Sequence, residues 1–433
     1  MSYIFFAIVL IAFVVAGFRE VTWISPGGAA KSPMQAMADA MIASADTSVT
    51  LAVGLVGVMA LFLGLMKVGE KGGLLVVIAR LVRPLMVRLF PEVPGEHPAM
   101  GAMILNLSAN VLGLGNAATP FGIRAMEELD RLNPAKGTAS NAMVLFLAIN
   151  TASVTVLPTS VIALRAAAGS ADPAGVIPTT LFATVIATAV AIFAAKVGQR
   201  WWPVGPATET ATVSGAEPVV PRENDLDAAP LDDVRSYPEW ASYLTLAAIL
   251  ALIPLTVVFG RTISPWIVPG LMVALLAFGL ARGVNIYEAF VEGARDGFSI
   301  ALRIIPYLVA ILVALAMLRA SGAMDMLIQP LALITAPLGV PAEALTMTLL
   351  RMLSGSGAFG YLASIINDPA IGPDSYTGYL VSTIQGSTET TFYVLAVYFG
   401  AVGIKRIRHA LVAGLLADVA GVAASALAVE LMI

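Results

Sequence analysis

The stretch from Gln385 to Thr391, with the sequence QGSTETT, interrupts an otherwise apolar segment that runs from Tyr379 to Val402. A segment of this length is a candidate membrane span. Hydrocarbon penalises unpaired polar groups, and a carboxylate such as Glu389 most heavily, so the run persists only where it faces protein, water or a ligand. It therefore indicates a membrane fold and marks the place where a functional site is expected.

The composition of the whole chain also indicates a polytopic membrane protein. Of its 433 residues, 58% are hydrophobic and 12% are charged, and the mean hydropathy is +0.88. Soluble domains carry roughly 25% charged residues, and here the deficit extends along the whole length. The chain has no cysteine and only two histidines, His97 and His409, which excludes disulfides, thiolate metal sites and a histidine-rich metal site. No basic stripe is long enough to suggest nucleic-acid binding.

Apolar segments of about 20 residues predict the membrane-spanning helices. These spans are expected at Ser2–Phe18, Ser48–Met66, Thr138–Leu164, Gly175–Lys196, Trp240–Phe259, Ser264–Ala281, Phe298–Leu318, Tyr379–Val402 and His409–Leu431. Shorter segments, interrupted by Gly and Pro, are expected to be broken, re-entrant or interfacial helices, because irregular backbone at membrane depth must be buried or line a cavity. These segments are Gly72–Phe90, Ala99–Leu112, Asn116–Leu132, Met324–Pro337, Ala342–Leu353 and Ala358–Ile366.

An acidic, proline-containing segment from Gln199 to Glu239 divides the chain, and its composition predicts a mostly disordered linker. The halves on either side, residues 1–198 and 240–433, repeat weakly in the same order. Gly/Pro-interrupted segments at matching positions in two halves are the best sequence indication of a transporter substrate site. The matching pairs are Leu61–Leu75 with Val313–Leu327, Leu105–Gly115 with Arg351–Tyr361, and Ile149–Pro158 with Ile384–Tyr393. The alternative is that small-residue patterns are common to membrane proteins.

The distribution of basic residues predicts that the two halves are inverted. Gly72–Phe90 is basic in the first half, whereas the hairpin Lys405–Arg408 is basic in the second, and basic loops stay cytoplasmic. The second half also has two spans before its core, where the first half has one. The N-terminus and linker are therefore expected in the cytoplasm, with the C-terminus periplasmic or extracellular.

Two polar runs are expected to line a site. On a continuous helix, Gln385, Thr388 and Glu389 would share one face, able to bind a polar solute or a cation, with Ser387 beside them. In the first half, Asn150 and Ser153 supply amide and hydroxyl groups before Pro158, which removes a helix hydrogen bond. The alternative for the second-half run is helix–helix contact through Ser and Thr. For the first-half run, the alternative is a structural kink with Ser and Thr hydrogen bonds inside the helix.

Two further breaks offer backbone dipoles to the same site. Ser354 and Ser356 lie in a Gly/Ser break between short apolar helices, and a half-helix after such a break presents free N–H groups. The corresponding polar residues of the first half are Asn106, Ser108 and Asn110. Close helix packing through small residues is the alternative. Asp418, in the last span, is either a second ionisable group or a partner of a neighbouring hydroxyl.

These motifs resemble those of two known families. Arg351–Gly360 (RMLSGSGAFG), Gln385–Tyr393 (QGSTETTFY) and Tyr398–Arg406 (YFGAVGIKR) strongly resemble spore maturation protein B. Asn106–Gly122 (NLSANVLGLGNAATPFG) resembles spore maturation protein A. The chain thus looks like a fusion of the two, which belong to the nucleoside-recognition, or Gate, domain superfamily. The resemblance implies an all-α polytopic membrane protein with two inverted Gate-type repeats, and it implies no particular substrate.

Two functions are weighed on these grounds. The first is an inner-membrane secondary transporter of a small polar or amphiphilic solute, nucleoside-like, amino-acid- or peptide-like, or cell-wall-derived. Coupling would be to H⁺ or Na⁺, with Glu389 and Asp418 as the ion-coupling candidates, since the sequence has no ATP-binding motif. The alternative is a non-transport envelope scaffold or lipid-binding protein that supports cell-wall assembly. An enzyme is not expected, and neither is a metal, a cofactor or a nucleic-acid partner. Membrane lipid is an expected partner, and a homo-oligomer is left open.

Overall fold

The computed structural model describes residues 2–24, 31–113, 115–203, 238–324, 326, 330, 335 and 339–432. Regular structure in this part of the chain is helical, apart from one isolated parallel bridge between Thr138 and Arg406. The predicted all-α class is therefore confirmed. Residues 204–237 of the predicted linker and most of Met324–Pro337 lie outside the described residues.

The first half begins with α1 and α2, continues with shorter helices and ends with the long helix α8. Its elements are α1 (Ser2–Val21), α2 (Pro33–Lys71), α3 (Leu74–Leu89), α4 (Pro98–Val111), α5 (Gly115–Arg131), α6 (Asn141–Thr151), α7 (Thr159–Ala167), the short 3₁₀ turn η1 (Pro173–Gly175) and α8 (Val176–Gly198). The second half contains α9 (Glu239–Ala281), α10 (Ile286–Ala320), α12 (Ala342–Leu353), α13 (Gly355–Ile366), α14 (Tyr376–Ser387), α15 (Thr391–Ala401) and α16 (Ala410–Met432).

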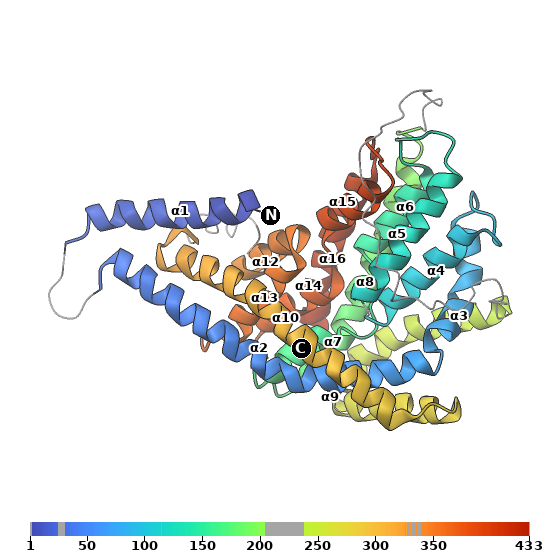
Figure 1. The fold of residues 1–433 in the computed structure, drawn as a ribbon, viewed down its shortest axis with the longest axis horizontal. Coiled ribbons are helices and arrows are strands. Elements are labelled where there is room, and N and C mark those ends of the chain that lie inside the picture. Colours follow the sequence, from blue (N-terminus) through green and yellow to red (C-terminus); the bar gives the residue numbers. More distant parts are fainter. Residues whose placement is uncertain are drawn as a thin grey trace.

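Both halves have the same order of elements around their centres. In each half a closely spaced pair of short helices, α4 and α5 or α12 and α13, is followed by a second broken pair, α6 and α7 or α14 and α15, and then by a long apolar helix, α8 or α16. In Figure 1 α4, α5 and α6 lie to one side of α8 and α16, while α12, α13 and α14 lie to the other. Three described helices are long and apolar enough to cross a membrane: Pro33–Lys71, Pro173–Gly198 and Ala410–Met432.

The structure corrects four of the predicted spans. Thr138–Leu164 and Tyr379–Val402 are not continuous, because each is divided into two helices at its polar run. Trp240–Phe259 and Ser264–Ala281 both fall within α9, with no loop assigned between them. The predicted topology counted two spans before the core of the second half, and the structure has one helix there. The side of the membrane on which each terminus lies stays a prediction.

Local chemistry explains why the polar runs end helices. Pro158 has no N–H to donate and disfavours helical backbone at Leu157, so no helix continues through this position and α7 starts directly after it. In the second half, Thr388 takes extended angles (φ −121°, ψ 157°) directly after α14. Its neighbouring Ser and Thr hydroxyls compete for backbone partners, which weakens a helix at this point.

The long helix α8 separates two ends of the molecule. At 23 residues it is about 34 Å long, close to the thickness of a bilayer's hydrocarbon core. Beyond its C-terminal end, the Trp202 carbonyl accepts hydrogen bonds from the Arg408 guanidinium. Just before its N-terminal end, the Asp172 carbonyl accepts one of 3.2 Å from Arg165 Nη2.

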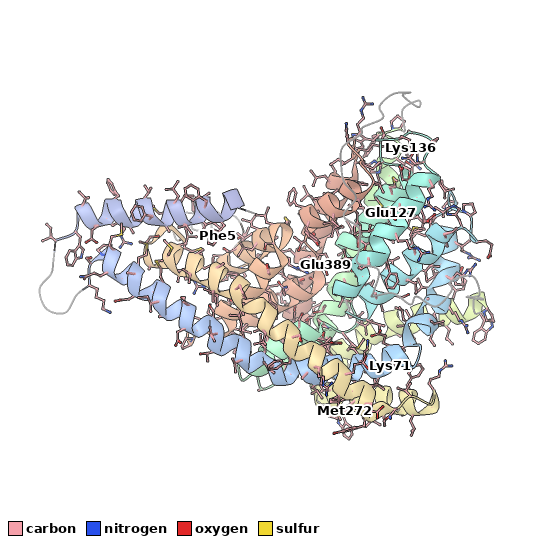
Figure 2. All side chains as sticks on the ribbon, viewed as in Figure 1. Phe5, Lys71, Glu127, Lys136, Met272 and Glu389 are labelled. Carbon is pink, nitrogen blue, oxygen red and sulfur yellow. The ribbon has the colours of Figure 1, made fainter. Side chains whose placement is uncertain are left out.

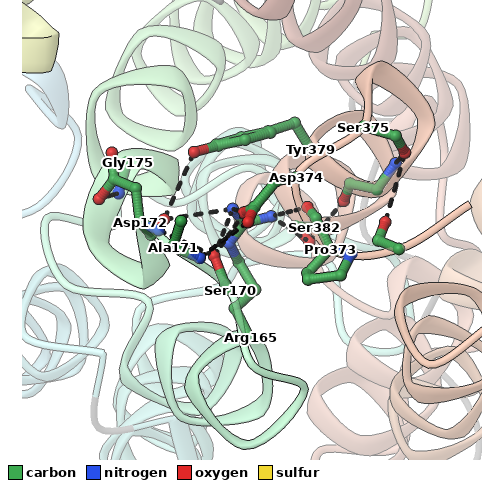
Figure 3. Close-up of polar contacts among 12 residues, drawn as sticks. Arg165, Ser170, Ala171, Asp172, Gly175, Pro373, Asp374, Ser375, Tyr379 and Ser382 are labelled. Carbon is green, nitrogen blue, oxygen red and sulfur yellow. Dashed lines mark hydrogen bonds and ion pairs between the residues drawn. The ribbon is translucent and has the colours of Figure 1, made fainter.

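At the Asp172 end, Arg165 joins the two halves (Figure 3). Its side chain is fully buried, and Nη2 lies 3.0 Å from Asp374 Oδ1 while Nη1 donates to the Pro373 carbonyl at 2.6 Å. The guanidinium stacks 3.9 Å from the centre of the Tyr379 ring. Asp374 also accepts from Ser170 Oγ and the Ala171 N–H. The α7–α8 loop is thereby bound to the loop before α14.

At the Trp202 end, the hairpin between α15 and α16 binds the loop before α6. The N–H groups of Lys405 and Arg406 both donate to the Gly137 carbonyl, at 2.9 and 3.0 Å. Arg408 Nη1 donates to Asn141 Oδ1 at 2.9 Å. Equivalent loops of the two halves thus lie at opposite ends, which is the arrangement expected of inverted halves. The two inverted repeats and the re-entrant segments themselves stay predictions.

The halves also share their cores. Phe146 of α6 stacks on Tyr398 of α15, with ring centres 6.1 Å apart, inside a core that otherwise comes largely from α4, α5 and α8. In the second core, Val161 and Ile162 of α7 pack with Leu380 and Ile384 of α14. The first half therefore contributes α7 to the second core, and the second half contributes α15 to the first core. Each core contains residues of both halves.

Candidate functional site

The two polar runs meet directly. The backbone N–H of Glu389 donates a hydrogen bond of 3.1 Å to the Thr151 carbonyl, where α6 ends and its break begins. The Glu389 N–H and the Thr151 carbonyl lie at helix ends, where no partner within a helix is available. Buried backbone polar groups need hydrogen-bond partners, and these two groups supply one to each other. Figure 2 shows Glu389 near the middle of the molecule, with Lys136 at the upper end. We call the region where the breaks 152–158 and 388–390 meet the crossing.

Glu389 is paired with an arginine from its own half. Arg351 Nη2, at the end of α12, lies 3.1 Å from Glu389 Oε2, and Nη1 donates to Thr390 Oγ1 at 3.3 Å. The Arg351 side chain is 8% exposed, whereas that of Glu389 is 41% exposed. Both charges are thus held at the crossing, the arginine deeply and the carboxylate at an accessible edge.

The predicted helical face was wrong. Gln385 lies on the last turn of α14, but Thr388 and Glu389 follow the end of that helix and leave its spacing. The physical reason is that Thr388 is extended, so its side chain does not continue the i, i+3, i+4 row. The Thr388 hydroxyl bonds back to the Ile384 carbonyl at 3.0 Å, and Gln385 Oε1 has no hydrogen-bond partner among the described residues.

The predicted Gly/Ser break lies next to the crossing. Ser354 separates α12 from α13 and caps α13, accepting from the Gly357 N–H at 3.0 Å, and its hydroxyl is 3.4 Å from that of Ser356. A Cβ added to Gly355 would lie 3.0 Å from Thr390 Oγ1 and 3.1 Å from Arg351 Nη1. Glycine at this position therefore lets the break approach the ion pair.

The first half has an equivalent contact between its two breaks. The Val156 N–H, inside the break 152–158, donates to the Val111 carbonyl at the end of α4, at 3.0 Å. Gly113, with φ of +73°, approaches so closely that a Cβ would lie 2.2 Å from the Leu157 carbonyl oxygen. Only glycine combines this backbone conformation with this approach. In each half, therefore, the turn between the short helices touches the polar break.

Asparagines form the first-half side of the crossing. Asn110 Nδ2 donates to Asn150 Oδ1 at 3.1 Å, and Asn150 Nδ2 donates to the Phe146 carbonyl at 2.9 Å. Asn106 Nδ2 donates to the Ala118 carbonyl at 2.8 Å and to the Tyr398 hydroxyl at 3.2 Å. Asn110 thus joins α4 to α6, and Asn106 joins α4 to α15 of the other half.

The last helix supplies a second carboxylate. Thr391 Oγ1 donates to Asp418 Oδ2 at 2.6 Å, and Asp418 is 1% exposed. Its Oδ1 has no partner within the described part of the chain. Ser387 Oγ lies 3.1 Å from Ser425 Oγ, also on α16. Of the two roles considered for Asp418, the pairing with a hydroxyl is observed, and one oxygen is left over.

The remaining predicted site residues differ in what they contact. Ser108 is fully buried, and its hydroxyl bonds the Ile104 carbonyl of its own helix at 2.7 Å. This is the intrahelical arrangement typical of a structural serine. Ser153 lies buried within the break, whereas Ser356 is exposed. The described residues contain no group of three or more His, Asp or Glu side chains placed to hold a metal ion.

Sequence reasoning missed Arg351, Thr151 and Arg165 as key groups. Arg351 carried a usable signal, because an arginine in the short apolar helix Ala342–Leu353 needs a partner at membrane depth. Arg165 stands directly after the predicted span that ended at Leu164, where a charge reads as an ordinary boundary. Thr151 acts through its carbonyl, which no side-chain pattern reveals.

This architecture is that of a helical membrane protein whose broken helices cross at polar positions. The chain belongs to the family described as "Gate: Nucleoside recognition", whose model matches residues 52–168 and 301–405. It is 47% identical to spore maturation protein B of Bacillus subtilis over 165 residues, 38% of this chain and 92% of that protein. It is 44% identical to spore maturation protein A of the same organism over 153 residues, 35% of this chain and 78% of that protein. The predicted fusion of the two is confirmed.

A more distant relative carries a location in its name. The chain is 33% identical over 88 residues to the inner membrane protein YjiG of Escherichia coli, covering 20% of this chain and 58% of that protein. No solved structure matches the chain. None of the relatives named here has an enzyme's name.

Proposed function

We propose that this protein is an inner-membrane secondary transporter whose small polar or amphiphilic solute binds at the crossing, between residues 1–198 and residues 240–433. The observation that carries the proposal is the hydrogen bond from Glu389 N–H to the Thr151 carbonyl, which joins two non-helical breaks from opposite halves. Broken helices facing each other at the interface of two halves are how transporters build substrate sites. The segment 199–239 is proposed as the cytoplasmic linker.

The polarity of the crossing supports solute binding more than simple helix contact. Among the described residues, Gln385 Oε1, Asp418 Oδ1, Asn106 Oδ1 and Arg351 Nε are buried side-chain atoms without a hydrogen-bond partner. Unsatisfied buried polar groups are costly, and a native structure keeps few of them unless they have a use. The proposed solute contacts are Asn106, Asn110, Asn150, Ser153, Ser354, Ser356, Gln385, Ser387, Thr388 and Glu389. Ser108, turned to its own helix, contributes packing.

Ion coupling is proposed to act through Glu389, with Asp418 as the second candidate. Glu389 is 41% exposed at the edge of the crossing and lies on the non-helical segment that follows α14. A carboxylate in that position can exchange a proton or meet Na⁺ as the halves move. Asp418 lies deeper and is already held by Thr391.

The test is transport by purified protein in proteoliposomes with an imposed H⁺ or Na⁺ gradient. Uridine, alanine, alanyl-alanine and N-acetylglucosamine serve as probes of the nucleoside, amino-acid, peptide and cell-wall classes. We expect gradient-driven accumulation of at least one class, and its loss in Glu389→Gln. Glu127→Gln is the matched control, because Glu127 is exposed on α5. If Glu389→Gln accumulates solute as the wild type does, its coupling role is wrong. If folded wild-type protein moves none of these classes, the envelope scaffold or lipid-binding role is favoured.

A further inference from the structure

We infer that the solute of the crossing is a zwitterion that carries both a carboxylate and an ammonium group, as a free amino acid or a short peptide does. The inference rests on the proposed function for its setting, and it narrows the solute classes left open there. It starts from the Arg351–Glu389 ion pair, which brings one charge of each sign to the place where the two breaks meet.

Because the pair has one charge of each sign, it disfavours solutes that carry a single charge. An anion drawn to Arg351 would lie within a few ångströms of the Glu389 carboxylate, and a cation drawn to Glu389 would meet the guanidinium. Repulsion at such distances is large where water is scarce. An uncharged solute gains little from either group, because it would have to compete with an ion pair that is already formed. A molecule with both charges can replace each partner by an equivalent one.

The unused atoms around the pair match the two ends of such a molecule. Arg351 uses Nη2 for Glu389 and Nη1 for Thr390, and its Nε is buried without a partner in the described structure. Nε and Nη2 together form the edge of the guanidinium that binds a carboxylate with two parallel hydrogen bonds.

On the acceptor side, Gln385 Oε1 and Asp418 Oδ1 are buried without partners among the described residues. Both belong to segments that adjoin the same break, since Gln385 precedes it on α14 and Asp418 bonds Thr391 directly after it. An ammonium group has three donors and no acceptor, so a carboxylate and additional oxygens are the partners that it requires.

The two charged side chains are unequally free to move. Arg351 is 8% exposed and sits at the end of a helix, whereas Glu389 is 41% exposed on the extended break. Glu389 is therefore the group that can swing away and admit the solute between itself and Arg351. While no solute is bound, the ion pair between Arg351 and Glu389 keeps the two charged groups at the crossing.

The test is binding, measured by calorimetry and by thermal stabilisation of the full-length protein in detergent. The probes are alanine and alanyl-alanine as zwitterions, propionate with the carboxylate only, ethylamine with the ammonium only, and uridine as an uncharged solute. Wild-type protein is expected to bind at least one zwitterion, and to bind propionate and ethylamine at least about tenfold more weakly.

Charge variants give the sharper prediction. Glu389→Gln leaves a net positive site and should gain affinity for propionate relative to the zwitterion, while Arg351→Gln leaves a net negative site and should gain affinity for ethylamine. Arg124→Gln and Glu127→Gln, at exposed positions of α5, are the matched controls and should change neither preference. If Arg351→Gln does not fold, the binding of the same probes by Arg351→Lys and by the wild type still tests the inference.

The outcomes separate this inference from the proposed function. Zwitterion binding without any flux in proteoliposomes supports the ligand class and contradicts transport. Uridine binding and flux without zwitterion binding contradicts the inference and leaves transport in place. Absence of zwitterion binding by folded wild-type protein, or charge variants with unchanged preferences, overturns the inference.

Discussion

Arg165 Nη2 and Asp374 Oδ1, separated by 209 positions in the chain, lie 3.0 Å apart and bind the α7–α8 loop of the first half to the loop before α14 of the second. The arginine is fully buried, and its guanidinium has further acceptors in the Pro373 and Asp172 carbonyls. A buried cation in this position depends on its counter-ion, so the pair is a structural joint between the halves.

Asp374→Asn should therefore destabilise the protein by about 3 kcal/mol, because it removes the carboxylate that lies 3.0 Å from the fully buried Arg165 guanidinium. The measurement is the melting temperature in detergent. Asp39→Asn is the matched control. It removes the partner of Lys31 from an ion pair whose side chains are 63% and 55% exposed, and pairs of this kind contribute about 1 kcal/mol or less. Equal melting temperatures for the two variants would contradict the role of the Arg165–Asp374 pair as a structural joint between the halves.

Gly293→Ala should separate α2 from α10. A Cβ at Gly293 would lie 2.4 Å from the Leu63 carbonyl oxygen and 2.6 Å from Lys67 Cβ, and backbone cannot yield as a side-chain tip can. Overpacking of this kind costs about 1–3 kcal/mol. Gly57→Ala on α2 is the control, since an added Cβ there meets nothing within 4 Å and alanine favours helix. We expect a lower melting temperature for the first and an unchanged or higher one for the second, and the reverse order would be inconsistent with this packing.

Thr391→Val tests the hydroxyl that holds Asp418. The substitution keeps the shape and removes the 2.6 Å donor to a carboxylate that is 1% exposed, which should lower stability by about 2 kcal/mol. Thr184→Val is the control, because the fully buried Thr184 hydroxyl bonds only the Leu181 carbonyl of its own helix among the contacts described. Its loss should have a much smaller effect. If both variants have the same melting temperature, the Thr391–Asp418 hydrogen bond does not contribute the predicted stability.

Cysteine labelling can determine the sidedness of the two ends, because the natural chain has no cysteine and therefore no background. Lys136 is in the loop that binds the basic hairpin Lys405–Arg408, whereas Ala370 is exposed in the loop that binds Ser170–Asp172. Basic loops stay cytoplasmic. An impermeant maleimide should thus label Ala370→Cys in intact cells, and Lys136→Cys only after permeabilisation. Labelling of both from the same side would overturn the predicted arrangement.

Sequence patterns predicted much of the helix content, since α8 and α16 match the spans expected at Gly175–Lys196 and His409–Leu431 within one or two residues. They also predicted the Gly/Ser break at Ser354, which separates α12 from α13. They failed at Thr138–Leu164 and Tyr379–Val402, because apolar length alone predicted continuous helices there. The polar residues inside those segments end the helix locally, and that effect competes with hydrophobicity.

The sequence by itself determined the class of this protein. A chain with so many apolar segments must bury their surface in lipid, and lipid allows few structures other than helices. Only the tertiary structure decided which groups meet, because Thr151 with Glu389, Arg351 with Glu389 and Arg165 with Asp374 are contacts between separate segments. Such contacts depend on how segments far apart in the chain pack together, and residue types along the chain do not encode that geometry in any local pattern.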